Sequence, residues 1–163
     1  VDGFELNIFQ ELNMLPEPFD GLFVSMNFTI TDGTSSLDVD NGTVTFPFRK
    51  LSEDVSNISI GYDKNKFDVR LSYVSRSPYL DYLADDDSET IQEDLDNNNI
   101  RYTDDHTQID FNLKYKINDN LSVKFDINNI TDEPEFYYWG TPNRLSQYDE
   151  YGTTYSIGIR YNL

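Results

Sequence analysis

The sequence predicts an all-β fold, an antiparallel up-and-down sheet that forms a segment of a transmembrane β-barrel, and three observations favour this class. Apolar side chains recur at every second position in seven stretches of the chain. The connections between these stretches alternate between short and long. Aromatic residues make up 15% of the chain, with twelve Tyr and eleven Phe, and such side chains favour strands.

The first four predicted strands follow from alternation alone. Apolar residues occupy every second position in residues 4–8, 22–30, 58–62 and 67–73. The positions between them are mostly polar or small, and in the fourth stretch they include Asp68 and Arg70. A period of two indicates a strand with one apolar and one polar face.

Three further strands are predicted in residues 109–115, 121–127 and 155–163 by the same pattern. No long helix is expected anywhere in the chain. On the polar face of the predicted sheet, basic and acidic side chains alternate, so a wall held together by salt bridges is expected there. Its members are Arg70, Lys114, Lys124 and Arg160 with Asp68, Asp110 and Asp126.

The lengths of the connections separate two interpretations of this sheet. Short connections over residues 16–21, 63–66 and 118–120 take turns with long ones over about residues 31–54, 78–105 and 131–150. In an outer-membrane barrel this is expected, because periplasmic turns are short and extracellular loops long. A soluble antiparallel sheet with one face on a core gives the same alternation within each strand and stays open as the alternative.

Composition and charge exclude several classes of function. The 163 residues carry twelve Lys and Arg against thirty Asp and Glu, a formal charge of −18. Such a chain repels phosphate backbones, so nucleic-acid binding is excluded. With no Cys and a single His, thiolate and most histidine chemistry is absent, and we expect no cofactor and no metal site.

The chain begins at Val1 without a basic segment, an apolar core or a cleavage site. We therefore expect a mature chain or a fragment of one. No stretch approaches the roughly 18 to 20 apolar residues of a membrane helix.

The last sixty residues contain a turn at residues 117–123 and an Asn-Asn-Ile-Thr-Asp-Glu-Pro signature at residues 128–134. These segments resemble the closing strands of a TonB-dependent outer-membrane receptor, in which such a turn is periplasmic. The resemblance continues in a last extracellular loop, residues 137–144 and 148–152, and in an alternating final strand. That strand ends in Leu163, where the family usually has Phe. Residues 3–6 and 15–22 resemble an earlier periplasmic turn of the same barrels.

The resemblance implies a fold and a function. The family joins a plug domain to a barrel of about 22 strands, and residues 1–163 would be the C-terminal part of that one barrel domain, without plug or signal peptide. The implied function is import of a scarce ligand across the bacterial outer membrane by energy-coupled rearrangement of the plug. Siderophore, haem, cobalamin and oligosaccharide remain open. The C-terminus would be periplasmic and the long loops extracellular.

The implied partners are the rest of the receptor barrel, the plug domain, outer-membrane lipid, a small-molecule ligand and, indirectly, the TonB complex. Two alternatives stay open. One is a small outer-membrane barrel that closes by itself. The other is an acidic soluble β-sandwich that serves as an adhesin or a calcium-binding module.

Two groups of residues are candidates for functional roles. Aromatic faces beside a cation suit a flat or anionic ligand at the pore mouth, although an interfacial aromatic belt is the competing interpretation; this cluster comprises Tyr137, Tyr138, Trp139 and Arg144. The second group is the barrel-assembly signal of the closing strand, formed by Tyr155, Ile157, Ile159, Tyr161 and Leu163.

Two weaker patterns do not indicate a catalytic site or a calcium site. His106 follows Asp104 and Asp105, but no nucleophile elbow accompanies it, so a catalytic triad is not expected and the protein is predicted not to be an enzyme. Residues 81–105 hold ten Asp or Glu against one basic residue, Arg101, without the spacing of a calcium loop. We expect a solvated, mobile loop there.

Overall fold

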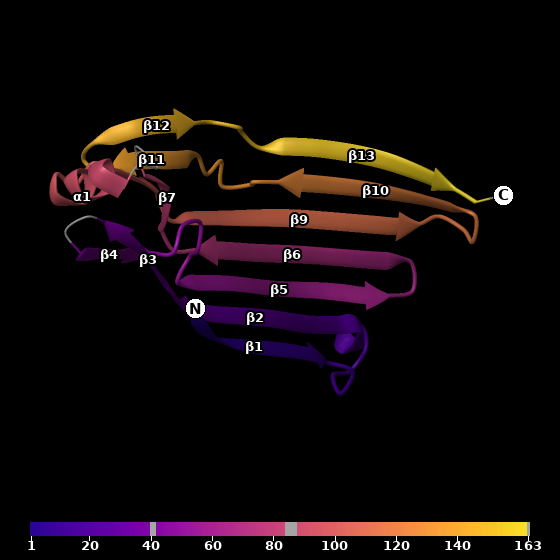
Figure 1. Ribbon diagram of the computed structural model, residues 1–163. Helices are drawn as coiled ribbons and strands as arrows, with labels where there is room; N and C mark the ends of the chain where they lie inside the picture. The colour runs from indigo at the N-terminus through magenta and orange to yellow at the C-terminus, as the bar shows by residue number, and fades with distance from the viewer. Residues whose placement is uncertain (40–41, 84–87, 163) are drawn as a thin grey trace.

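The computed structural model describes residues 1–39, 42–83 and 88–162. Seven strands form one antiparallel sheet in which neighbours in sequence order are also neighbours in space (Figure 1). This confirms the predicted up-and-down segment. The strands are, in order, β1 (Asp2–Glu11), β2 (Leu22–Asp32), β5 (Asp54–Lys64), β6 (Phe67–Arg76), β9 (His106–Lys116), β10 (Leu121–Asn128) and β13 (Thr154–Tyr161).

The register places the alternating apolar residues on one face of this sheet. One row of partners crosses five strands, from Ile8 through Met26, Ile58 and Tyr73 to Ile109. No described element covers this apolar face, and many of its side chains are exposed, Ile157 by 77% and Ile159 by 75%. A sheet in water would bury such a face, so the uncovered face argues against the soluble sandwich.

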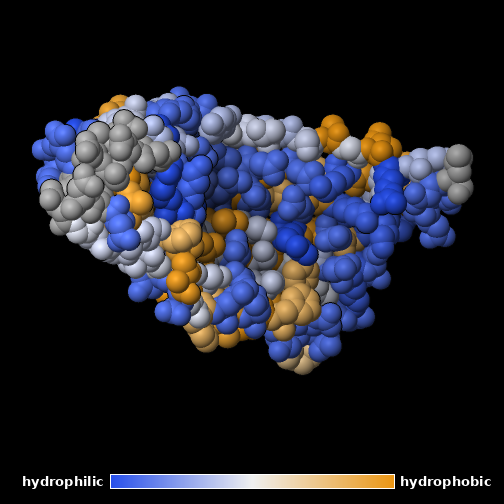
Figure 2. All heavy atoms as spheres, viewed as in Figure 1, coloured by the Kyte–Doolittle hydropathy of each residue, from blue (hydrophilic) through white to orange (hydrophobic). Residues whose placement is uncertain are grey.

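The opposite face is polar and partly cross-linked by hydrogen bonds. Asn27 Nδ2 donates to Glu5 Oε1 at 2.9 Å and to Asn7 Oδ1 at 2.6 Å, while Asn57 Nδ2 donates to Asn27 Oδ1 at 3.3 Å. In Figure 2, viewed as in Figure 1, hydrophilic residues dominate the visible face, and hydrophobic residues form smaller patches within it and along its margins.

The expected salt-bridged wall on this polar face is wrong in most of its members. Among the described residues, only Lys124 forms an ion pair there, with Asp126 at 3.0 Å. Lys114 lies opposite Asp68 in the register, yet the two form no ion pair. Sequence alternation places opposite charges on one face, but it does not fix side-chain rotamers, and long Lys side chains can extend away from the neighbouring strand.

The connections lie at opposite ends of the sheet according to their length (Figure 1). We call the end with the three short connections the turn end. The first of these contains a short helix, η1 (Phe19–Gly21), and is fixed by Lys64 Nζ, which donates to Asp20 at 2.6 Å and to Glu17 at 3.0 Å. The other end, with the three long connections, is the loop end.

The long connections contain further regular structure that the sequence did not predict. The first holds the hairpin β3 (Thr34–Val39) and β4 (Gly42–Pro47). The second and third supply a four-stranded sheet with the order β12-β11-β8-β7. Its elements are β7 (Tyr79–Leu83), β8 (Ile100–Thr103), β11 (Glu135–Trp139) and β12 (Leu145–Asp149), and one helix, α1 (Ser88–Asp96), joins β7 to β8.

The prediction of a mobile loop over residues 81–105 is therefore wrong for the described part of this segment. Leu80, Leu83, Ile91 and Ile100 are buried together with Val44 of the first hairpin in a small core. The ten acidic residues dominated the composition of this segment, so the sequence did not reveal that its few apolar residues form a core. Their burial is sufficient to order the connection. No helix in the described ranges is long and apolar enough to cross a membrane.

One aromatic contact on the polar face depends on a glycine. Phe23 is 7% exposed, and its ring contacts Phe9 at a centroid distance of 5.8 Å. A Cβ atom at Gly61 would lie 2.2 Å from Cζ of Phe23 and 2.8 Å from the backbone oxygen of Val69. The absence of a side chain at Gly61 therefore makes room for Phe23.

We expect Gly61→Ala to destabilise the sheet by about 1–3 kcal/mol, because Phe23 must leave its place over β5. Gly158→Ala is the matched control, since a Cβ atom at Gly158 would meet nothing within 4 Å. The measurement is urea unfolding of the detergent-solubilised protein. Equal midpoints for the two variants would contradict the packing role of Gly61.

Candidate functional site

The four-stranded sheet at the loop end carries the side chains that could contact a ligand. Its two faces differ. Tyr138 is 8% exposed and stacks on Tyr102 with ring centroids 5.6 Å apart, on the face that also carries Leu80 of the small core. Burial raises the pKa of both tyrosines.

Tyr137 and Trp139 belong to the opposite face, because successive residues of β11 alternate between faces. Arg144 lies in the turn after β11, where its Nη1 donates to the backbone oxygen of Asn98 at 3.0 Å. The structure thus does not bring the four residues of the predicted aromatic cluster together on one surface. A ligand-contact role for Tyr137, Tyr138, Trp139 and Arg144 stays a prediction.

Arg101 is the centre of the face that carries Tyr137. Its guanidinium lies 5.2 Å from the ring centroid of Tyr137 and 5.9 Å from that of Tyr82. Nε and Nη2 of Arg101 both donate to one carboxylate oxygen of Asp81, the first at 2.8 Å. We call Tyr82, Arg101 and Tyr137, together with Arg49 over the ring of Tyr82, the arginine–tyrosine face.

One of the two tyrosines of this face, Tyr137, acts as a hydrogen-bond donor. Tyr137 Oη donates to Glu135 Oε2 at 2.7 Å, and this hydrogen bond, reinforced by burial, raises the pKa of Tyr137 far above its usual value. Planar cations and aromatic rings bind flat or polar ligands without covalent chemistry. The arginine–tyrosine face can therefore bind a ligand, and it contains no nucleophile with an activating base.

Sequence reasoning missed Arg101 as a site residue. The signal that could have found it was its isolation as the one basic residue among ten carboxylates in residues 81–105. A single cation in such a segment is expected to gain a carboxylate partner, and Asp81 is that partner.

Among the described residues, none forms a catalytic triad with His106. Its Nε2 lies 3.4 Å from Gln108 Oε1, and Nδ1 has no hydrogen-bond partner in the described part of the chain. Oδ1 of Asp104 accepts a hydrogen bond from the backbone of Asp105, and burial raises the pKa of Asp104. Within residues 1–39, 42–83 and 88–162, no group of three His, Asp or Glu could hold a metal ion. Residues 85–87 of the acidic segment lie outside the described residues.

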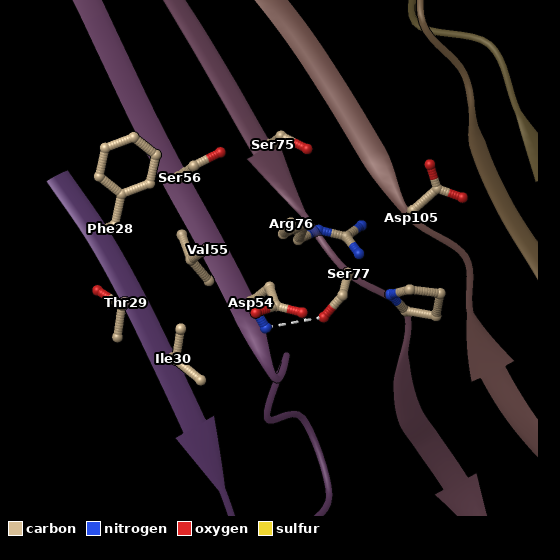
Figure 3. A pocket seen from close by; sticks show the side chains of 11 residues that line it. Phe28, Thr29, Ile30, Asp54, Val55, Ser56, Ser75, Arg76, Ser77 and Asp105 are labelled. Atoms are coloured by element: carbon tan, nitrogen blue, oxygen red, sulfur yellow. Dashed lines mark hydrogen bonds between the residues drawn. The ribbon is translucent and has the colours of Figure 1, made fainter. Parts of the chain in front are cut away.

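A pocket of about 410 Å³ lies where β2, β5 and β6 reach the loop end (Figure 3). Ser77 and Arg76, two of its polar residues, are engaged by the protein itself. The backbone nitrogen of Asp54 donates to Ser77 Oγ at 3.0 Å, and Arg76 donates to the backbone oxygen of Asp104 at 2.8 Å while lying over the ring of Tyr79. These contacts leave a mainly apolar recess, lined by Phe28 and Ile30 among others.

The described residues of the predicted assembly signal lie on β13, at one edge of the seven-stranded sheet. β13 pairs with β10 along its whole length, and its alternate residues join the apolar face. Leu163 lies outside the described residues. The described members of the signal are Tyr155, Ile157, Ile159 and Tyr161, all of them exposed.

Comparison with known proteins identifies the family of this fold. The family model described as TonB dependent receptor-like, beta-barrel, matches residues 1–130, and the chain belongs to that family. No curated protein and no solved structure matches the chain. The match covers β1 to β10 and ends before the last long connection and β13, so for residues 131–163 the family resemblance rests on their own motifs.

We expect Arg101→Met to destabilise the loop-end sheet by about 1–3 kcal/mol, because it leaves the nearly buried carboxylate of Asp81 without its cation. The double variant Asp81→Asn with Arg101→Met should recover most of this loss. Hydrogen exchange of the β8 amides in the whole receptor is the measurement. If the double variant exchanges as fast as Arg101→Met alone, the ion pair is not what orders β7 and β8.

Proposed function

We propose that this chain is a section of the barrel wall of a TonB-dependent receptor that imports a scarce ligand across the bacterial outer membrane. Family membership supports the coarser statement, that it is an outer-membrane receptor and transporter barrel. The observation that carries the proposal is the continuous, uncovered apolar face over all seven strands. In a barrel wall this face contacts lipid and the polar face lines the lumen.

Further strands would complete the wall. β1 and β13 are the two edges of the sheet, and among the described residues each pairs on one side only. Unpaired backbone groups are too costly in lipid for such edges to remain open. The sheet is therefore proposed to be continued by strands outside residues 1–163, with the plug domain of the receptor inside the closed barrel.

The orientation follows from the lengths of the connections. Short connections belong to the periplasmic side and long ones to the outside. On this basis we propose that the turn end and the C-terminus lie in the periplasm and the arginine–tyrosine face on the extracellular side. Ligand would be captured there and at the plug, and the TonB complex would then drive the plug to release it inward.

We expect energy-dependent uptake by cells that produce the whole receptor. Cobalamin, haem, a ferric siderophore and a labelled oligosaccharide serve as probes, one at a time. At least one should accumulate, and a protonophore should abolish its accumulation because TonB draws on the inner-membrane proton gradient. Accumulation that a protonophore leaves unchanged would favour the small self-closing barrel, and no accumulation of any probe would contradict import.

Two neighbouring residues of β2 test which face meets lipid. Met26 belongs to the apolar face and Ser25 to the polar one. We expect Met26→Arg to cost about 2–4 kcal/mol of folding stability in a bilayer, because a charge enters the hydrocarbon region. Ser25→Arg should be tolerated, since it faces the lumen. The measurement is the folded fraction of receptor in lipid vesicles under urea, and the reverse order would invert the assignment of the faces.

A further inference from the structure

The apolar face of the seven-stranded sheet is interrupted near the loop end. Most of its rows carry large apolar side chains from strand to strand. The row of Phe28 differs, because the positions that follow it across the sheet are Ser56 on β5, Ser75 on β6 and Thr107 on β9. Small polar side chains thus replace large apolar ones beside Phe28, which leaves the surface hollow there.

The next row toward the loops is also polar after β2. Ile30 lies opposite Asp54, and the row continues to Ser77, whose backbone nitrogen donates to the backbone oxygen of Asp54 at 2.9 Å. The Oγ atom of Ser77 accepts the backbone N–H of Asp54 at 3.0 Å. Asp105 directly precedes β9 at the same level, and both Asp54 and Asp105 are exposed. This row therefore presents two carboxylates at the margin of the apolar face.

The recess of about 410 Å³ covers both rows. Figure 3 shows Phe28 and Ile30 on one side of it and Asp105 on the other, with Ser56 and Ser75 between them. Its volume lies within the range of roughly 300 to 1,000 Å³ that is usual for small-molecule sites. The recess is therefore large enough to hold part of an elongated molecule.

Arg76 also lines the recess, but its charge is engaged elsewhere. It follows Ser75 in β6, so it belongs to the polar face of the sheet. Its guanidinium lies 5.0 Å from the ring centroid of Tyr79, and its Nη1 donates to the backbone oxygen of Asp104 at 2.8 Å. The charge at the margin of the recess is therefore that of the two carboxylates.

The place of the recess on the sheet indicates its occupant. In the proposed barrel the apolar face contacts lipid, and the loop end lies where acyl chains join their polar head groups. A lipid at this level presents a chain, a carbonyl group and a head group, in this order. Along β5 the structure offers the matching order of an apolar side chain at Ile58, a hydroxyl at Ser56 and a carboxylate at Asp54.

We propose that the recess binds one lipid with an amine-bearing head group. Its acyl chain lies against Phe28, the hydroxyls of Ser56 and Ser75 donate to its carbonyl oxygen, and its amine lies beside Asp54 and Asp105. The proposal rests on the proposed function, because only a barrel wall turns this face toward lipid. Lipids beside the flat parts of the face contact protein on one side, whereas this lipid contacts it on several sides and is retained longer.

Photolabelling of the whole receptor tests the proposal. The receptor is placed in phosphatidylcholine vesicles that contain phosphatidylethanolamine with a diazirine on one acyl chain. One sample is irradiated in the vesicles and a second after repeated exchange into detergent, and mass spectrometry identifies the labelled residues. In vesicles we expect label across the apolar face, including Met26 and Ile58. After exchange, label should persist within residues 28–30, 54–56 and 75–78.

Three variants separate retention in the recess from ordinary lipid contact. Ser56→Leu fills the recess with a side chain that suits a lipid-facing position, so it should keep the label in vesicles and lose the retained label. Ser56→Ala leaves the space open and should retain it. Val69→Leu enlarges the same face about 20 Å from Ser75 along β6, and it should also retain the label.

Each contrary result has its own meaning. Label that exchange removes equally from the recess and from the rest of the apolar face would overturn the retained lipid and leave the barrel wall intact. Label confined to the polar face in vesicles would contradict the proposed function itself. Photochemical links between two receptor copies at residues 28–30 would assign the recess to a second copy. Equal retention of diazirine-bearing phosphatidylglycerol would overturn the assignment of the head group to the two carboxylates.

Discussion

The register of the seven antiparallel strands is the constraint on which the rest of the structure depends. Side chains alternate strictly between the faces, so a slip of one residue between two strands would move a whole set of apolar residues to the polar face. The row from Ile8 to Ile109 remains apolar across five strands because no such slip occurs. This register separates a polar face from an apolar face that no described element covers.

The seven wall strands were predictable from the sequence, whereas the loop-end sheet was not. A period of two is a local property, and each wall strand shows it over at least three apolar positions. β7, β8, β11 and β12 have only four or five residues each, and the sheet is joined where β8 pairs with β11 of the next long connection. Its order depends on distant parts of the chain, as does the core in which Leu80 and Val44 are buried together, and no local pattern contains this information.

The candidate site shows the same limit at the level of single residues. Tyr137 and Tyr138 are neighbours in sequence and were expected to act together, but once residues 135–139 form a strand they must point to opposite faces. Arg101 and Asp81 are twenty residues apart and meet only because β7 pairs with β8. Sequence composition drew attention to the aromatic segment, and the strand divides its members between two faces.

The small core at the loop end bears on how a ligand would be recognised. Loops without such a core would have to become ordered when the ligand arrives, and this ordering reduces affinity. Here Leu83, Ile91 and Ile100 already fix β7, α1 and β8, so the arginine–tyrosine face is formed before any ligand is present. Its Arg101 is also neutralised by Asp81 in advance. An anionic ligand would have to compete with that carboxylate, whereas an uncharged ring could stack on the exposed part of the guanidinium without separating the pair. The geometry of this face therefore favours flat, uncharged groups over anions.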